Sequence, residues 1–194
     1  PVFAPEEVQY GKNLLQAAQR AGVRKLVFSS VIHPVLNLPN HAAKALVEEV
    51  LVTSGLEYTV LHPTMLYQNY GASWDRIVET GILAEPWSAD TRFSRVDYRD
   101  VADVAAIALT EDRLAFGTFE LCAPDILTRH GVAELLSQVL GKKVGYATLD
   151  RNKLGNVPKD MLTMFEHYDH SGLLGNPLTL RSILGREPRT LRAY

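Results

Sequence analysis

The sequence contains a single cysteine, Cys122, among its 194 residues. One cysteine cannot form an intramolecular disulfide, and it excludes a metal site built from several thiolates. Such sparse use of cysteine is typical of a reducing compartment, so we expect a cytoplasmic protein. Cys122 itself belongs to an apolar segment, and we expect it to be a core residue.

The sequence also has no large excess of positive or negative charge and no long apolar run. The chain has 20 Lys and Arg against 22 Asp and Glu, a formal net charge of −2, whereas a nucleic-acid binder usually carries a basic excess. No uncharged apolar run reaches the ~18 residues that a membrane span needs. We therefore expect neither nucleic acid nor a membrane as a partner. His33 and His41 have no carboxylate or thiol at ligand spacing, so no metal site is expected.

Glycine-rich phosphate-binding motifs are absent as well. Neither G-x-G-x-x-G nor G-x-x-x-x-G-K-[ST] occurs, and these are the patterns with which backbone amides hold phosphates. A G-x-S-x-G nucleophile elbow is not found either. The printed residues therefore contain no recognisable phosphate loop and no hydrolase nucleophile of this type.

What the sequence does have is an alternation of helical and extended segments. A helix is predicted over Pro5–Ala21, and Gly22 is its expected left-handed cap. The continuous apolar run Lys25–Val31 is typical of a parallel strand covered on both faces. A second helix is predicted from Asn40 or His41 to residue 53, with Asn40 as its N-cap. With a strand over residues 58–62 it forms a right-handed βαβ unit.

The rest of the chain continues the alternation less regularly. Helices are predicted over residues 74–79, 99–110, 128–140 and 158–170, and strands over 92–96, 118–122 and 143–148. Alternating strands and helices indicate an α/β fold.

In an open parallel sheet, ligands bind outside the carboxyl ends of the strands. The two strand ends of the βαβ unit carry the candidate ligand-binding residues Ser29, Ser30, Val31, His62, Pro63, Thr64 and Met65. The serines can equally cap the loop backbone, and a lone histidine at a strand end is more often packed than catalytic.

Lys44 is expected in the first turn of the connecting helix, where a cation opposes the helix dipole. That placement suggests a use: Lys44 could donate to the ribose hydroxyls or phosphate of a bound nucleotide. Alternatively, it is a solvated lysine paired with Glu48 four residues further on.

Aromatic residues follow the second strand end. Tyr67, Asn69, Tyr70 and Trp74 could wall a pocket for a flat ring, or they could simply pack a smaller lobe. Asp100 and Asp103 are expected at the start and on the exposed face of their helix.

Several stretches of the chain resemble the NmrA-like family, a branch of the atypical short-chain dehydrogenases/reductases. They are AGVRKLVFSSV at 21–31, HAAK at 41–44, SGLEYTVLHP at 54–63 with Asn69 beyond it, VDYRDVA at 96–102 and LGREPRT at 184–190. Their order and spacing agree over nearly the whole chain.

The resemblance implies an α/β fold with a partial Rossmann (parallel βαβ) sheet and a small α/β C-terminal lobe. Residues 1–66 would be the C-terminal half of a Rossmann NAD(P)-binding domain. Residues 67–194 would form the smaller substrate lobe, with some strands and helices returning to the main sheet. The implied cofactor is NADP or NAD, with NADPH favoured by the family.

The resemblance also implies roles for individual residues. Lys44 would be the catalytic lysine that contacts the nicotinamide ribose. The segment His62–Met65 would lie against the nicotinamide half, and Ser29 and Ser30 would line the cofactor crevice. Tyr67, Asn69, Tyr70 and Trp74 would contribute to the acceptor pocket.

One departure from the dehydrogenase pattern concerns the proton donor. Ordinary short-chain dehydrogenases have a tyrosine four residues before the lysine, and here that position is Asn40. Asn40 cannot donate a proton as a phenol does, which puts conventional alcohol dehydrogenase chemistry in doubt. Hydride transfer to a quinone, a dye or another carbonyl-type acceptor remains open, because the cofactor carries that chemistry.

A second departure concerns the start of the chain. The family begins with a glycine-rich strand–turn–helix that the printed residues lack. The strand predicted at 25–31 also needs neighbours on both edges. We therefore expect these residues to be the C-terminal part of a longer protein.

Three functions follow as hypotheses. The first is an NADPH-dependent oxidoreductase with a small-molecule acceptor. The alternative is a non-catalytic NAD(P) redox sensor that acts through a regulatory protein partner, which Asn40 slightly favours. The third is a segment that binds no dinucleotide and serves as an interaction or dimerisation unit, with a homodimer as one outcome.

Overall fold

The computed structural model describes residues 6–194, and the helix start predicted at Pro5 lies outside them. Three strands form the main sheet: β1 (Lys25–Ser29), β2 (Glu57–Pro63) and β6 (Gly117–Leu121). The strand order is β1-β2-β6 and both pairings are parallel. The sequence prediction of a parallel βαβ unit is therefore confirmed.

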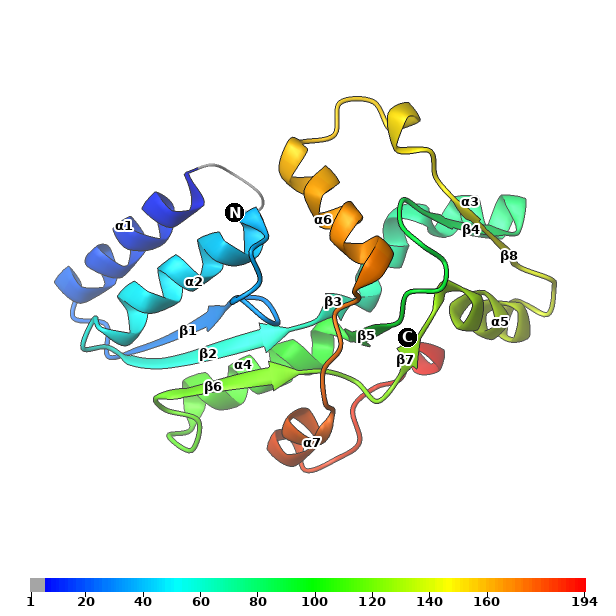
Figure 1. Ribbon diagram of the computed structural model, residues 1–194. Coiled ribbons are helices and arrows are strands. Elements are labelled where there is room, and N and C mark those ends of the chain that lie inside the picture. Colours follow the sequence, from blue (N-terminus) through cyan, green and yellow to red (C-terminus); the bar gives the residue numbers. More distant parts are fainter. Residues whose placement is uncertain (1–5) are drawn as a thin grey trace.

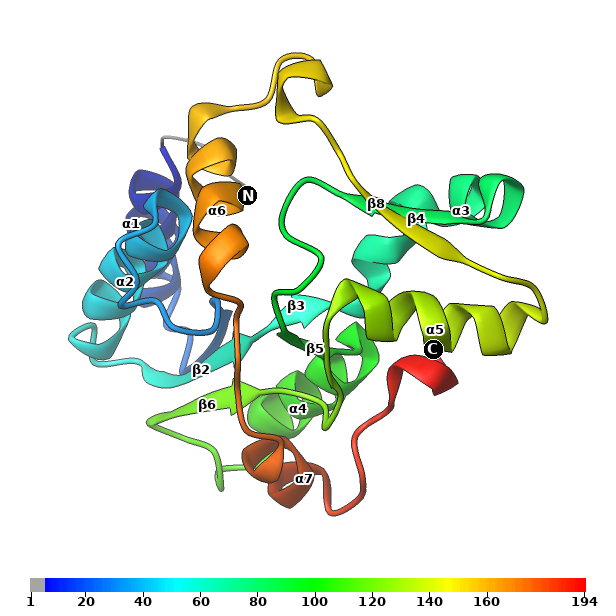
Figure 2. The same ribbon diagram turned by 45° about the vertical axis from the view of Figure 1, so that its right-hand side comes forward.

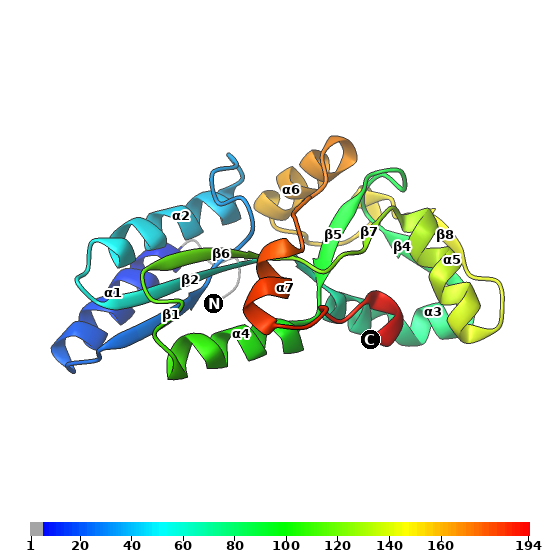
Figure 3. The ribbon, with the colours of Figure 1, turned by 90° about the horizontal axis from the view of Figure 1, so that it is seen from below.

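Helices cover both faces of this sheet (Figures 1 and 3). The helices α1 (Glu7–Arg20) and α2 (Pro39–Val52) lie on one face, and α4 (Tyr98–Thr110) lies on the other with α7 (Leu178–Leu184) beside it. Within residues 6–194, no helix is both long and apolar enough to cross a membrane.

The alternation of side chains along β2 explains why two consecutive residues at its centre, Val60 and Leu61, are both apolar. Val60 packs with Leu15 and Leu51 of the first two helices, whereas Leu61 packs with Val104 and Leu180 on the opposite face. Successive strand residues point to opposite faces, and both faces are covered here. Val60 and Leu61 are therefore both completely buried.

The first two helices approach each other closely at one glycine. A Cβ placed on Gly11 would lie 2.6 Å from a methyl carbon of Val47. The missing side chain of Gly11 is thus what allows α1 and α2 to pack together.

A smaller lobe stands at the carboxyl end of the main sheet (Figure 2). It contains β4 (Ile82–Glu85) paired in parallel with β8 (Gly145–Thr148), between α3 (Trp74–Thr80) and α5 (Arg129–Leu140). The sequence analysis did not predict β4, which has only four residues between a helix and a loop.

Short elements join the two parts. Strand β5 (Phe93–Val96) pairs in parallel with β3 (Met65–Leu66) and antiparallel with β7 (Ile126–Leu127). The remaining elements are η1 (Tyr67–Ser73), η2 (Arg151–Lys153), α6 (Lys159–His170) and η3 (Leu191–Ala193). In Figures 1 and 2, α6 stands between the main sheet and the smaller lobe.

The chain has an α/β fold, and its strands and helices agree with most of the predicted ranges. Strand β6 and helix α4 come from the second half of the chain and pack into the main sheet. The proposed division after residue 66 stays a prediction.

The predicted start of α2, at Asn40 or His41, is one or two residues too late, and the prediction of Asn40 as the N-cap is wrong. The N-cap is Leu38, in an extended conformation, and Pro39 is the first helical residue. Proline suits that position because its missing N–H would be unsatisfied there in any case. Asn40 therefore lies inside the helix, and Lys44 lies in the second turn rather than the first.

Cys122 is a core residue, as predicted. It is fully buried in a cluster with Ile32, Phe93 and Phe165, and burial, together with the nearby Glu120, raises the pKa of its thiol to about 12.

We expect the folded protein at pH 8 to react with Ellman's reagent at least a hundredfold more slowly than a free thiol. The reason is that the thiolate is the attacking species. In denaturant, one thiol per chain should react at the normal rate. Full labelling of the native protein within minutes would contradict the buried position.

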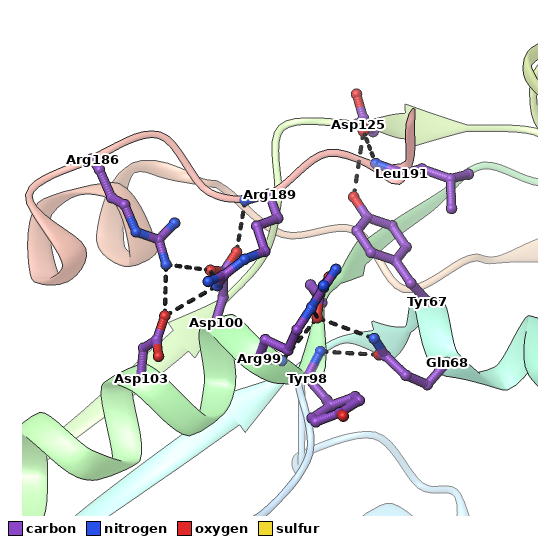
Figure 4. A network of polar contacts seen from close by, with 11 residues as sticks. Tyr67, Gln68, Tyr98, Arg99, Asp100, Asp103, Asp125, Arg186, Arg189 and Leu191 are labelled. Carbon is purple, nitrogen blue, oxygen red and sulfur yellow. Dashed lines mark hydrogen bonds and ion pairs between the residues drawn. The ribbon is translucent and has the colours of Figure 1, made fainter. Parts of the chain in front are cut away.

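A polar network fastens the C-terminal segment to α4 (Figure 4). Arg186 Nη2 donates to Asp100 at 2.7 Å, and the backbone N–H of Arg189 donates to the other oxygen of Asp100, also at 2.7 Å. Asp100 is completely buried. Asp100 lies in the first turn of α4, as expected, and residues 86 and 89 positions further along the chain cover it.

The side chain of Asp97 caps the N-terminus of α4. The Asp97 side chain accepts from the backbone N–H of Arg99 at 2.8 Å and from Gln68 at 3.0 Å. Burial alone would raise the pKa of Asp97, but the hydrogen bonds from Arg99 and Gln68 hold it below its usual value.

Candidate functional site

The carboxyl ends of β1 and β2 lie side by side, as parallel pairing requires. Backbone hydrogen bonds continue past the strands: Ser30 N–H donates to Leu61 O at 2.8 Å, and Ile32 N–H to Pro63 O at 3.0 Å. The segments that follow the two strands therefore stay in register and form one rim of the main sheet.

A carboxylate on α2 holds two of the predicted site residues. Ser30 Oγ donates to Glu48 Oε1, and His62 Nε2 lies 3.0 Å from the same oxygen. Ser30, His62 and Glu48 are all largely buried. Thr64 is also buried, and its hydroxyl donates to Ser94 O at 2.8 Å.

These contacts limit what each residue can offer a ligand. The hydroxyls of Ser30 and Thr64 already donate within the protein, and each oxygen keeps only its acceptor capacity. Ser29 is exposed, and Val31, Pro63 and Met65 are half-buried along the same rim.

The Lys44 ammonium contacts a carboxylate from α1. Its Nζ forms an ion pair with Glu7, whose side chain is almost completely buried. The pair with Glu48 that the sequence offered as an alternative is not formed, because Glu48 turns toward the strands. Lys44 and Ser29 line a cavity of about 320 Å³ whose other walls are Glu7, Tyr10, Gly11, Leu14, Phe28 and Val47.

Asn40 lies one helical turn before Lys44. Its side-chain Nδ2 is buried and has no hydrogen-bond partner among residues 6–194. A buried amide donor without a partner is costly, and residues four apart in a helix lie on the same side. Asn40 and Lys44 therefore bring two N–H donors to the same side of α2.

Three of the four residues predicted for an acceptor pocket are divided between two cavities. Tyr67 is completely buried, and its hydroxyl lies 3.3 Å from Asp125. Asn69 and Tyr70 line a cavity of about 160 Å³. Tyr70 and Trp74 line another of about 480 Å³, between α3, α5 and the C-terminal segment. Tyr70 thus stands between two cavities, and the joint acceptor pocket stays a prediction.

The structure also shows functional candidates that the sequence analysis missed. Arg95 is 3% exposed on β5, and Arg129 is 2% exposed at the start of α5. Glu85, at the end of β4, lies between them, 3.1 Å from Arg129 Nε and 4.0 Å from Arg95 Nη2. The only sequence signal was a charge at position 95 inside a predicted strand.

Among residues 6–194, no three His, Cys, Asp or Glu side chains are grouped in a way that could hold a metal ion.

Comparisons with known proteins place this chain in a family. A model of the NmrA-like family matches residues 2–191. The chain therefore belongs to the NmrA-like family.

Two characterised relatives are similar in sequence. The NAD(P)H azoreductase of Xenophilus azovorans is 30% identical over 149 residues, which are 76% of this chain and 52% of the azoreductase. Quinone oxidoreductase 2 of Escherichia coli is 26% identical over 193 residues, 93% of this chain and 66% of that enzyme. The chain thus spans about half to two thirds of the length of these relatives.

Solved structures share the fold. An NADPH-dependent quinone oxidoreductase from Escherichia coli, complexed with NADPH, superimposes with a TM-score of 0.85 at 24% identity, over 99% of this chain and 71% of the other. The triphenylmethane reductase of Citrobacter sp., complexed with NADP(H), gives 0.82 at 19% identity, over 96% and 69%.

Proposed function

We propose that this chain provides the nicotinamide-side part of an NAD(P)H-dependent oxidoreductase that reduces a quinone-, dye- or carbonyl-type acceptor. The observation that carries the proposal is the family membership over residues 2–191. Relatives named as a quinone oxidoreductase and an azoreductase support the acceptor class.

The residues at the rim of the sheet suit a ribose and a nicotinamide. Lys44 keeps N–H donors beyond the one that Glu7 accepts, because an ammonium has three. Asn40 Nδ2 is a buried donor that no residue of the described range 6–194 pairs with, and Ser29 supplies an exposed hydroxyl in the cavity that it lines together with Lys44. When bound, the reduced nicotinamide would supply a hydride.

In this proposal the chain's own residues bind and orient. Lys44 holds the nicotinamide ribose through its remaining N–H groups, and the Glu7 carboxylate keeps the ammonium in place. Glu48 fixes Ser30 and His62, so the rim keeps its shape while Val31, Pro63, Thr64 and Met65 pack against the ring.

The test is NADPH oxidation by the full-length protein that contains these residues, with menadione and an azo dye as acceptors. We expect steady turnover, and we expect Lys44→Ala to lower kcat/KM at least tenfold through loss of a charged hydrogen bond. Lys143→Ala is the matched control, because Lys143 is an exposed lysine far along the chain in the smaller lobe.

Asn40 favours a second function, a redox sensor that binds the dinucleotide without turnover. The NADP complex of NmrA, a negative transcriptional regulator, shares the fold with a TM-score of 0.74 at 18% identity. Tight NADPH binding without turnover on any acceptor would support the sensor and refute the reductase. Absence of both binding and turnover would refute both, and would leave an interaction or dimerisation segment.

A further inference from the structure

We propose that the cavity between η1, β4 and β5 is an oxyanion-binding subsite, in which Arg95 and Tyr70 donate hydrogen bonds to an oxygen of a small planar ligand. The cavity measures about 160 Å³, and Asn69, Tyr70, Glu85, Trp87 and Arg95 are among the residues that line it.

Two of the lining residues carry a buried polar atom that makes no regular hydrogen bond to residues 6–194. These atoms are Arg95 Nε and the Tyr70 hydroxyl oxygen, and Arg95 also interacts with the side chain of Tyr70. Buried polar groups are nearly always paired, since an unpaired donor costs about 1–3 kcal/mol. Two such donors on the wall of one cavity point to an acceptor supplied from outside the chain.

The acceptor that this site prefers carries negative charge. Arg95, Arg129 and Glu85 together have a net charge of +1, because the single carboxylate of Glu85 lies between two guanidinium groups. Glu85 is closer to Arg129, at 3.1 Å, than to Arg95, at 4.0 Å. The charge of Arg95 is thus the less compensated of the two.

The aromatic rings around Arg95 hold its guanidinium in place. It lies 5.3 Å from the centre of the Tyr70 ring and 5.4 Å from that of Phe93, distances at which ring faces attract a cation. Burial raises the pKa of Tyr70, so its hydroxyl stays protonated and can donate. Both donors are therefore oriented before a ligand arrives.

The size of the cavity limits the ligand. At about 30 Å³ per water molecule, 160 Å³ is comparable to the space of about five waters, so the subsite takes an oxygen group with part of one ring. Met65 and Leu66 line the inner wall, directly after the carboxyl end of β2. The subsite is thus next to the rim where the proposed nicotinamide would lie.

Which oxygen of the acceptor the subsite would bind depends on the proposed reductase function. Hydride addition to a quinone puts an electron pair on a carbonyl oxygen, which becomes an oxyanion and then takes a proton from water, while NADPH is oxidised to NADP⁺. Arg95 and Tyr70 would stabilise that developing charge. A carboxylate or sulfonate on a dye presents the same chemistry with a permanent charge.

The binding step can be tested without any cofactor. Trp87 lines the cavity, whereas Trp74 lines the other one, so a Trp74→Phe background isolates the fluorescence of Trp87. We expect benzoate to change this fluorescence with saturation, and its neutral analogue benzamide to bind at least tenfold more weakly.

Two variants separate a ligand role from a structural one. Tyr70→Phe should weaken benzoate binding about three- to tenfold and leave the urea midpoint unchanged or higher, because the lost hydroxyl makes no regular hydrogen bond to the described residues 6–194. Arg95→Met should weaken it about 10- to 100-fold. Arg92→Met, an exposed neighbour on the same segment, should have no effect on binding.

The outcomes decide the proposal separately from the reductase assignment. The proposed subsite would be overturned if benzoate and benzamide bound equally well. It would also be overturned if the Tyr70→Phe variant bound benzoate normally and unfolded at a lower urea concentration.

If the subsite does bind benzoate, steady-state kinetics identify which oxygen of the acceptor it holds. A loss in kcat on a neutral quinone in Tyr70→Phe indicates the developing oxyanion, and a rise in KM only for carboxylated acceptors indicates a substituent. Benzoate binding without NADPH oxidation would keep the subsite and refute the proposed reductase.

Discussion

Replacing Arg129 by alanine should lower the free energy of unfolding by about 3–5 kcal/mol, the usual cost of removing one partner from a buried ion pair. The side chain is 2% exposed. Its guanidinium donates to Glu85, to the carbonyls of Ala147 and Trp87 and to the Thr148 hydroxyl, at distances of 2.5–3.1 Å. All of these acceptors would lose a donor at once.

The measurement is urea unfolding at constant m-value, which reports stability rather than a change in the unfolded state. Arg181→Ala is the matched control. That arginine pairs with Glu187 at 2.7 Å, but both side chains are substantially exposed, so removal should cost less than about 1 kcal/mol. Similar losses in the two variants would show that the Arg129 cluster is not the buried anchor that joins β4, β8 and α5.

Replacing Asp100 by alanine should have the second-largest effect, a loss of about 2–4 kcal/mol. The buried carboxylate accepts from Arg186 and from both the backbone and the side chain of Arg189, and hydrogen bonds to charged groups contribute about 1.5–3 kcal/mol each. Because these bonds fasten the C-terminal segment to α4, we also expect faster proteolysis after residue 184.

Asp103 provides the comparison for Asp100, since it contacts the same two arginines at 2.7 and 3.0 Å from the next turn of α4. Its side chain is 47% exposed, compared with 0% for Asp100. Asp103→Ala should therefore cost less than about 1 kcal/mol. If the two variants unfolded at the same urea concentration, burial would not be the deciding factor.

The main elements of the fold were predictable because their signals are local. The apolar run at β1, the glycine after α1 and the acidic cap of α4 each act within a few residues. Strand β4 was missed because four residues between a helix and a loop carry no periodicity that can be measured. The start of α2 was misplaced because two capping signals, Pro39 and Asn40, compete at adjacent positions.

For the candidate site, the sequence predicted the position of the residues in the fold but not their contacts. The rule for parallel sheets predicted that the residues after β1 and β2 share one rim, and the structure places them side by side there. That a ligand binds at this rim stays a prediction. Their partners were not predictable: Lys44 contacts Glu7, 37 residues away, instead of Glu48, four residues away. The spacing of residues in a helix predicts which side chains of that helix are neighbours. It cannot predict that Lys44 instead pairs with the buried carboxylate of Glu7 on another helix.

By itself, the sequence determined the α/β alternation, the parallel βαβ unit and the resemblance to the NmrA-like family, because periodicity, caps and motifs depend on adjacent residues. Only the tertiary structure decided which charges are buried and what they contact. Arg95 and Glu85 come from separate strands, and Asp100 is covered by a segment 86 residues further on. Such contacts depend on how the chain folds back on itself, and electrostatic strength depends on the burial that results.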